Sequence, residues 1–230
     1  MSSKLILLDA VGTLFGVQGS VGAVYAQIAA QHGVSCDTTA LDQAFYCAFD
    51  GAEPLAFPHL ELAEIPDAEY NWWHEIALRT FAKTEDLVKF EDFASFFADL
   101  YSYFATAEPW FIYADTVPAL EKWRQQGIEL GIISNFDSRL YRVLDALNLT
   151  PYFQSVTIST EAGSAKPDRQ IFSYALAKHP PTNNVIYIGD SYGTDILGAM
   201  NSGIPAVWIN RQPRTNEMRS YIHTLTELIF

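Results

Sequence analysis

The stretch Lys4-Leu5-Ile6-Leu7-Leu8-Asp9-Ala10-Val11-Gly12-Thr13-Leu14 contains the signal that decides the fold. Its unbroken apolar run predicts a strand that is buried on both faces, as in a parallel sheet. The run stops at Asp9, and the glycine that follows allows a tight turn. We therefore expect a carboxylate at the carboxyl end of a buried strand, where it is a candidate nucleophile. Two positions later, Val11 has a side chain that cannot carry a proton.

The second half of the chain alternates between apolar runs and amphipathic patterns. The runs predict strands at 128–133, 155–159, 185–188 and 206–209. The amphipathic stretches predict helices at 116–126, 138–147, 168–178 and 194–201. Strands that alternate with helices indicate an α/β fold, with a Rossmann-like parallel sheet and helices on both faces.

A long segment of helical patterning separates the first strand from the second. We therefore divide the chain into a Rossmann-like core, residues 1–15 and 113–230, and an inserted all-helical domain, residues 16–112. Ser20 is placed to cap the first helix of this insert. Aromatic residues are frequent at 70–74 and 90–104. Their helical spacing favours packing in the core of the insert, and the lining of a substrate pocket is the alternative.

The charge of the chain is unevenly distributed. The 230 residues carry a net charge of −13, and residues 16–112 hold fifteen acidic against three basic residues, a net charge of −12. So acidic a chain is not expected to bind nucleic acid, because clustered Lys and Arg supply the affinity for phosphate backbones. With two cysteines, no signal peptide and no apolar run long enough for a membrane span, we expect a soluble cytoplasmic protein.

Oxygen ligands for a cation are predicted at the strand ends. Open parallel sheets bind ligands at the carboxyl ends of their strands. Asp9 follows the first strand, and Asp190 and Asp195 follow the strand at 185–188. Carboxylates are hard oxygen ligands of the kind that Mg²⁺ prefers, and the main-chain carbonyl of Val11 is a further candidate ligand. The sequence therefore predicts a Mg²⁺ site, whereas the five histidines show no metal-ligand spacing.

Side chains and amides that could bind a phosphoryl group are also predicted near the carboxyl ends of the strands. The Ser134 hydroxyl, the Asn135 main-chain amide and the Lys166 ammonium are placed to bind the oxygens of a substrate phosphate. This arrangement leaves the Asp9 carboxylate free to attack phosphorus. A small organic phosphate is the expected substrate, and the sequence does not indicate an oligomeric state.

These residues form four motifs that, taken together, resemble the haloacid dehalogenase-like (HAD) superfamily of hydrolases. In chain order the motifs are Asp9-Ala10-Val11-Gly12-Thr13, Ser134-Asn135, Lys166-Pro167-Asp168 and Gly189-Asp190-Ser191-Tyr192-Gly193-Thr194-Asp195. The insert resembles the helical cap of subfamily I, and Trp72-Trp73 with the missing second aspartate is similar to the rhythmically-expressed-gene-two-like branch. The resemblance implies roles for the motif residues, namely nucleophile and metal ligand for Asp9, phosphate binding and catalysis for Ser134 and Lys166, metal ligation for Asp190 and metal support for Asp195.

The departure at Val11 affects the expected activity. In phosphatases of this superfamily an aspartate at that position protonates the leaving group and then activates water. General acid–base help of this kind is worth roughly 10²–10⁴-fold in rate. We therefore expect a magnesium-dependent hydrolase of phosphoesters or acyl phosphates that is slow, with an aspartyl-phosphate on Asp9 that is hydrolysed slowly.

Three alternatives remain open at this stage. The first is a catalytically impaired protein that keeps the phosphate and metal site but has lost turnover. The second is dehalogenase-type or phosphonate-cleaving chemistry, which the absence of arginine before Arg79 and of lysine between Lys4 and Lys83 disfavours. The third gives the acidic insert a basic partner, although a solvated acidic face is the commoner explanation of such charge. For Asp195, capping of the helix that follows it is also considered.

Overall fold

The computed structural model describes residues 4–211 and 221–228. The chain divides into two compact units. The first contains residues 1–16, 56–59 and 112–230, and the second contains residues 17–55 and 60–111. The short segment 56–59, which the sequence division placed in the insert, belongs to the first unit.

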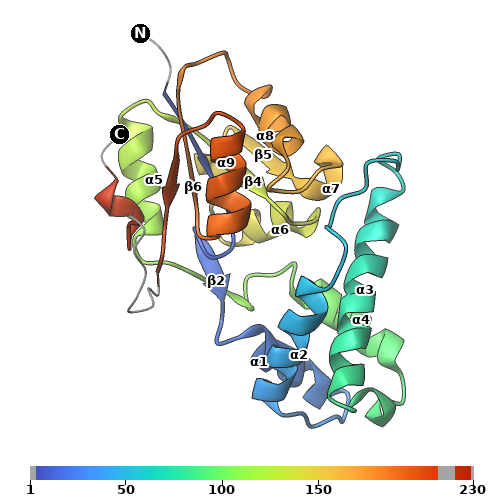
Figure 1. Cartoon of the computed structure of the whole chain (residues 1–230). Coiled ribbons are helices and arrows are strands. Elements are labelled where there is room, and N and C mark those ends of the chain that lie inside the picture. Colours follow the sequence, from blue (N-terminus) through green and yellow to red (C-terminus); the bar gives the residue numbers. More distant parts are fainter. Residues whose placement is uncertain (1–3, 212–220, 229–230) are drawn as a thin grey trace. The chain divides into compact units, whose positions relative to one another are not determined.

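A parallel sheet is the centre of the first unit (Figure 1). Its strands lie in the order β5-β4-β1-β6-β7 over the described residues, with the bounds β1 Lys4–Leu8, β4 Glu129–Ser134, β5 Ser155–Ile158, β6 Asn184–Gly189 and β7 Ala206–Trp208. All the pairings are parallel, and Leu8 lies opposite Ile132 of β4 and Ile188 of β6. The apolar run of β1 is fully covered, because Ile6, Leu7 and Leu8 are each 0% exposed.

Helices cover both faces of this sheet, as predicted. The bounds are α5 Thr116–Gln125, α6 Arg139–Ala146, α7 Ser159–Ala162, α8 Arg169–Leu176 and α9 Leu197–Asn201. The chain moves outward from β1 through α5 to β4 and through α6 to β5, and then crosses back through α8 to β6 and through α9 to β7. Right-handed crossovers in opposite directions place α5 and α6 on one face and α8 and α9 on the other. The order therefore reverses at β1, and such a switch point is where open α/β sheets bind ligands.

One predicted helix differs in form. The stretch 194–201 begins earlier than expected, with a π-helical turn at Tyr192–Ile196 that continues into α9. The Ser191 side chain accepts a hydrogen bond from the Thr194 amide and caps this turn. Asp195 lies inside the turn, so the alternative that Asp195 caps the helix is wrong. Single π-helical turns occur often at functional sites.

The second unit is built from helices with short connections. Its elements are α1 Val21–Gln31, α2 Thr38–Asp50, α3 Ile65–Lys83, the 3₁₀ turn η1 Leu87–Lys89 and α4 Phe93–Tyr103. Ser20 accepts a hydrogen bond from the Ala23 amide and caps α1, as predicted. The Asp37 side chain caps α2 and the Asp92 side chain caps α4 in the same way. Each of these caps satisfies a backbone donor that a helix start leaves unpaired.

Aromatic side chains form a large part of the core of this second unit, together with aliphatic ones. Phe81, Phe96 and Phe97 are buried, and the Phe81 ring stacks on Tyr25 with 6.0 Å between centroids. Trp72 and Trp73 are partly buried at the edge of this cluster. The aromatic stretch around Phe96 and Phe97 is therefore core, as its helical spacing predicts.

The chain passes between the two units in two short strands. These are β2, Phe15–Val17, and β3, Trp110–Ile112, which pair as a two-stranded sheet. The remaining short elements are the 3₁₀ turns η2 Thr150–Tyr152 and η4 Leu225–Glu227. Over residues 4–211 and 221–228, none of the helices has the length and apolar character that a membrane crossing requires.

Candidate active site

Asp9 stands at the carboxyl end of β1, at the centre of the sheet. Its amide donates a hydrogen bond to the Ile188 carbonyl of β6, at 2.9 Å, so the backbone stays in register with the sheet up to this residue. The chain then turns back, with the Leu14 amide donating to the Ala10 carbonyl at 2.8 Å. Gly12, inside this turn, has a φ of +87°, a conformation that favours glycine. The turn holds the Asp9 side chain at the switch point, where it is 6% exposed.

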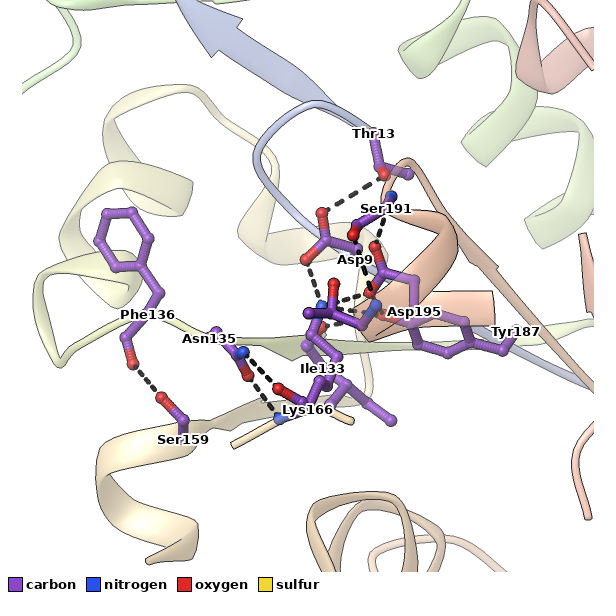
Figure 2. A network of polar contacts seen from close by, with 11 residues as sticks. Asp9, Thr13, Ile133, Asn135, Phe136, Ser159, Lys166, Tyr187, Ser191 and Asp195 are labelled. Atoms are coloured by element: carbon purple, nitrogen blue, oxygen red, sulfur yellow. Dashed lines mark hydrogen bonds and ion pairs between the residues drawn. The ribbon is translucent and has the colours of Figure 1, made fainter. Parts of the chain in front are cut away.

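Lys166 brings its ammonium to this carboxylate. The distance from Lys166 Nζ is 2.6 Å to Asp9 Oδ1, 2.7 Å to Asp195 Oδ1 and 3.0 Å to the Tyr187 hydroxyl. Figure 2 shows this network of polar contacts around Lys166 and Asp9. An ammonium has three N–H donors, so these three acceptors match its full capacity. Lys166 is 6% exposed, which makes these contacts strong determinants of its position.

Asn135 holds the backbone that carries Lys166. Its side-chain oxygen accepts a hydrogen bond from the Lys166 amide at 2.7 Å, and its side-chain nitrogen donates to the Lys166 carbonyl at 2.9 Å (Figure 2). The main-chain amide of Asn135 was the predicted substrate-binding group, and this pair of side-chain hydrogen bonds was not predicted. Ser134, which precedes it, is buried at the carboxyl end of β4, the strand beside β1.

Asp195 is held from three directions. Its Oδ1 accepts hydrogen bonds from Lys166 Nζ and from the Tyr187 hydroxyl, the latter at 2.7 Å, and its Oδ2 accepts one from the Ser191 amide at 3.0 Å (Figure 2). The residue is 1% exposed. Gly189 lies directly beneath, because a Cβ on it would come within 2.4 Å of Asp195 Cγ. The π-helical turn and this glycine together let the carboxylate lie close to the sheet.

Asp190 approaches the site from the end of β6. Unlike Asp9 and Asp195, it is exposed, but its carboxylate packs over the turn after β1. A Cβ on Gly12 would lie 2.2 Å from Asp190 Oδ2, so only glycine leaves room for this approach. On the other side, Trp208 Nε1 donates to the Asp190 carbonyl at 2.8 Å and anchors the backbone.

Crowding of acidic groups shifts their proton affinity. Burial raises the pKa of Asp9 to about 6; Lys166 opposes this rise and Asp195 adds to it. The pKa of Asp190 is raised to about 7, because surrounding protein atoms remove water from the carboxylate and the charges of Asp9 and Asp195 repel its own. Burial lowers the pKa of Lys166, but the attraction of Asp195 and Asp9 outweighs it and the net pKa is raised. The ammonium therefore stays charged.

The three carboxylates suit a divalent cation. Asp9, Asp190 and Asp195 each offer an oxygen, and these oxygens lie within 4.8 Å of one another. A cation placed among them would relieve the repulsion that raises the pKa values of Asp9 and Asp190. Carboxylate oxygens are the ligands that Mg²⁺ prefers. The residues present therefore fit the predicted cation.

Tyr187 was missed by sequence analysis. It lies in the apolar run of β6 and was interpreted only as part of a strand. Its ring does pack in the core, with 5.4 Å between its centroid and that of the Phe172 ring of α8, and the residue is 0% exposed. Burial and the neighbouring charges of Asp195 and Asp9 raise the pKa of Tyr187 well above its usual range, so the hydroxyl keeps its proton. The available signal was that a tyrosine in a fully buried strand needs a polar partner for its hydroxyl.

Comparison with known proteins assigns the family. A family model described as haloacid dehalogenase-like hydrolase matches residues 3–203. The chain belongs to this family. Its relatives include haloacid dehalogenase-like hydrolase domain-containing protein 3 of Danio rerio, which is 31% identical over 91% of this chain and 86% of the relative. Rhythmically expressed gene 2 protein of Drosophila melanogaster is 27% identical over 95% of this chain and 87% of the relative, in line with the predicted branch.

A further relative and three solved structures extend this picture. Pyrimidine 5'-nucleotidase YjjG of Escherichia coli is 42% identical over 37% of this HAD-like chain and 40% of the relative. A HAD phosphatase of Thermococcus onnurineus is 26% identical with a TM-score of 0.62, covering 97% of this chain and 95% of its own. The HAD-hydrolase YfnB of Bacillus subtilis has a TM-score of 0.74 at 18% identity, covering 99% and 97%, and so shares the fold. L-2-haloacid dehalogenase of Xanthobacter autotrophicus shares it too, with a TM-score of 0.64 at 21% identity, covering 92% and 79%.

Proposed function

We propose that this HAD-like chain is a magnesium-dependent phosphohydrolase that acts on a small organic phosphate through an aspartyl-phosphate on Asp9. The observation that carries the proposal is the arrangement of Asp9, which lies 2.6 Å from the Lys166 ammonium and within one cluster with Asp190 and Asp195. The positive charge of Lys166 offsets the repulsion between an anionic nucleophile and an anionic substrate. The 26% sequence identity to the HAD phosphatase of Thermococcus onnurineus supports the proposed phosphoryl chemistry.

Asp9 has one carboxylate oxygen held and one placed for attack. Oδ1 accepts from Lys166, and Oδ2 has a longer contact, 3.4 Å, with the Thr13 hydroxyl (Figure 2). In the proposed reaction Asp9 forms a bond to phosphorus, the bond from phosphorus to the leaving oxygen breaks, and water later releases inorganic phosphate from Asp9. In this proposal the Ser134 hydroxyl and the Asn135 amide donate to the phosphoryl oxygens, and Lys166, whose three N–H groups already have acceptors, binds them through its positive charge.

The proposed Mg²⁺ would be held by Asp9, Asp190, the Val11 main-chain carbonyl and, as a supporting group, Asp195. When bound, it would supply positive charge that neutralises the phosphoryl oxygens. The second unit is proposed to act as the helical cap. We propose a cytoplasmic location as well, for which the low cysteine content argues.

Val11 makes the proposed reaction slow. It is a half-buried residue of the turn after β1 and forms an isolated backbone bridge with Phe15. Its isopropyl group cannot donate a proton to a leaving alkoxide or take one from the attacking water. Esters with good leaving groups, and acyl phosphates, are therefore the substrates for which turnover is expected to survive best.

Two competing functions are weighed against this proposal. A binding protein that keeps the site but has lost turnover would be phosphorylated at most once on Asp9. A dehalogenase needs a cation for the released halide, but in the second unit Arg79 pairs with Glu75 at 2.7 Å and Lys89 pairs with Asp86. No arginine precedes Arg79 in the sequence, and together with these pairs this disfavours dehalogenation.

A substrate screen tests the proposal. Phosphate esters, nucleoside monophosphates, acyl phosphates and haloacids are assayed with and without Mg²⁺; the nucleotides are included because YjjG is a nucleotidase. We expect Mg²⁺-dependent turnover of at least one phosphate, and Asp9→Asn is expected to abolish it while the fold is retained. Asp145→Asn, an exposed change on α6, is the matched control and is expected to be neutral. Equal rates in Asp9→Asn and the wild type, or activity on haloacids alone, would refute the proposal.

A further inference from the structure

Tyr187 has a hydroxyl whose hydrogen-bonding roles are fixed by its neighbours. An ionised carboxylate only accepts and an ammonium only donates. The hydroxyl must therefore donate its single proton to Asp195 Oδ1, at 2.7 Å, and accept from Lys166 Nζ, at 3.0 Å. A hydroxyl has one proton, so the Ile133 carbonyl at 3.4 Å stands only at the edge of this network (Figure 2).

This hydroxyl closes a three-membered network. Lys166 Nζ also donates directly to Asp195 Oδ1 at 2.7 Å, so each of Tyr187, Lys166 and Asp195 contacts the other two. The exposed fractions of the three residues are 0%, 6% and 1%, and bulk water is thus kept from competing for these bonds. Buried networks with every donor and acceptor satisfied are the ones that fix side chains in one arrangement.

The ring of Tyr187 fixes the hydroxyl in turn. It extends from β6, a central strand of the sheet, and packs against Phe172 of α8. Neither the loop that carries Lys166 nor the π-helical turn that carries Asp195 is part of the sheet. The hydroxyl therefore joins a side chain that is anchored in the sheet to both of the charged side chains that irregular segments bring to the site.

We propose that Tyr187 is a positioning residue, which through its hydroxyl holds the Lys166 ammonium at the distance and angle from Asp9 that phosphoryl transfer requires. This assignment rests on the proposed phosphohydrolase function. Tyr187 acts through the hydrogen bonds that its hydroxyl forms with Lys166 and Asp195. The consequence lies in the rate of the chemical step, because misplacement of a catalytic group costs rate more than it costs substrate binding.

Tyr187→Phe tests the assignment, because it removes the hydroxyl and keeps the ring in the core. We expect kcat on acetyl phosphate or p-nitrophenyl phosphate to fall by about tenfold, the loss that one hydrogen bond to a charged group produces. KM is expected to change by less than about threefold, since Ser134 and the Asn135 amide stay in place and Lys166 keeps its charge. Circular dichroism and thermal unfolding establish that the variant is folded. Tyr174→Phe, on the exposed face of α8, is the matched control and should match the wild type.

A double-mutant cycle separates positioning from general stabilisation. If Tyr187 acts through Lys166, its hydroxyl has nothing to position once the ammonium is gone. The rate of Asp9 phosphorylation in Lys166→Met/Tyr187→Phe should then equal that in Lys166→Met alone. A Tyr187→Phe loss of the same size in both backgrounds, or an unchanged kcat in the single variant, would overturn the assignment while the proposed function stands. A wild-type protein that neither turns over nor becomes phosphorylated on Asp9 would instead overturn the function, and the assignment with it.

Discussion

Two residues without side chains allow the acidic cluster to form. Gly12 leaves space for the Asp190 carboxylate, and Gly189 leaves space for that of Asp195. In sequence both residues look like ordinary turn or strand-end glycines. In the structure each lies under a carboxylate. A Cβ built on either glycine would come within 3 Å of the nearest carboxylate atom. The positions of Asp190 and Asp195 thus depend on the absence of a Cβ at Gly12 and Gly189.

Gly12→Ala is expected to displace Asp190. The new Cβ would lie 2.2 Å from Asp190 Oδ2, and relief of such a contact costs about 1–3 kcal/mol in packed sites. Mg²⁺ affinity and turnover should both fall by about tenfold or more, which calorimetry and a phosphatase assay measure. Gly127→Ala is the matched control, because Gly127 also has a positive φ, +71°, but nothing within 4 Å of its Cβ position. Equal effects of the two changes would mean that backbone strain, and not the carboxylate, is responsible.

Val11→Asp tests the missing acid. The new carboxyl group is expected to speed hydrolysis of esters with poor leaving groups by about 10²-fold, at the lower end of general acid–base effects. Nitrophenyl and acyl phosphates should gain less, because their leaving groups need little protonation. Steady-state rates on both classes measure this difference. Val11→Asn has the same shape without the acid and serves as control; a gain in both variants would show that polarity of the turn, and not proton transfer, had limited the rate.

At the residue scale, charged motif residues were predictable and neutral supporting residues were not. Asp9, Lys166, Asp190 and Asp195 are found together, as their places after predicted strands implied. Asn135 was assigned through its main chain, although its side chain holds Lys166. Such supporting roles depend on three-dimensional distances between distant segments, which apolar and polar patterns do not encode.

At the element scale, strands were more predictable than the turns that follow them. The apolar runs located β4, β5, β6 and β7 because burial on both faces leaves a clear composition. The π-helical turn before α9 has no comparable signature, since the same residues are compatible with an ordinary helix start. In the structure the Asp195 carboxylate, inside the turn, accepts a hydrogen bond from the amide of Ser191, the residue that caps the turn.

A polar cluster that the sequence did not predict lies at the start of α5. Asp115 Oδ1 accepts from Arg211 at 2.8 Å, and Oδ2 accepts from the Leu225 amide at 2.6 Å. Arg211 also donates to the Thr13 carbonyl at 2.5 Å and stacks over the Tyr113 ring at 3.7 Å. The cluster therefore joins the helix, the segment near residue 225 and the turn that follows Asp9.

The Asp115 cluster makes stability depend on pH. Burial alone raises the pKa of Asp115, but hydrogen bonds from Arg211 and the Leu225 amide outweigh it and hold the pKa below its usual value. A carboxylate with a lowered folded pKa stabilises the protein above its unfolded pKa of about 4, and this contribution is lost as pH falls through the folded value. Asp115→Asn should therefore lower the free energy of unfolding by about 1–3 kcal/mol at pH 7, and the difference from wild type should shrink below about pH 4.

Urea unfolding at pH 7, 5 and 3 measures this difference. Asp145→Asn, an exposed substitution on α6, is the control and should show little difference at any of the three pH values. A constant deficit for Asp115→Asn from pH 7 to pH 3 would mean that the ionised carboxylate contributes nothing through Arg211 and Leu225.

At the scale of the whole molecule, nearly all of the net negative charge lies in the second unit. Residues 16–112 have a net charge of −12, and the remaining residues are almost neutral. Exposed acidic groups of the second unit, such as Asp50, Glu53 and Glu91, contribute to a long-range negative field. A field of this kind lowers the local concentration of anionic substrates, in proportion to their charge. The site is therefore expected to prefer small monophosphates over nucleoside triphosphates.

Ionic strength should change this preference in a defined direction. The Debye length falls from about 30 Å at 0.01 M to about 8 Å at 0.15 M ionic strength, so salt screens the field of distant acids. The ratio of kcat/KM for a nucleoside triphosphate to that for a small monophosphate should then rise with salt. Both rates are measured at equal free Mg²⁺, and the comparison of two substrates on one protein cancels general effects of salt on the active site.

A charge-reduced variant assigns this salt effect to the second unit. Asp50→Asn, Glu53→Gln and Glu91→Gln together remove three exposed negative charges without changing the size of the side chains. At low salt the variant should turn over the triphosphate better than the wild type does, with less change for the monophosphate, and the two proteins should converge as the Debye length shortens. A wild-type protein that prefers the triphosphate at low salt would contradict the field argument. A variant that matches the wild type at every ionic strength would show that the acidic residues of the second unit do not act on the substrate from a distance.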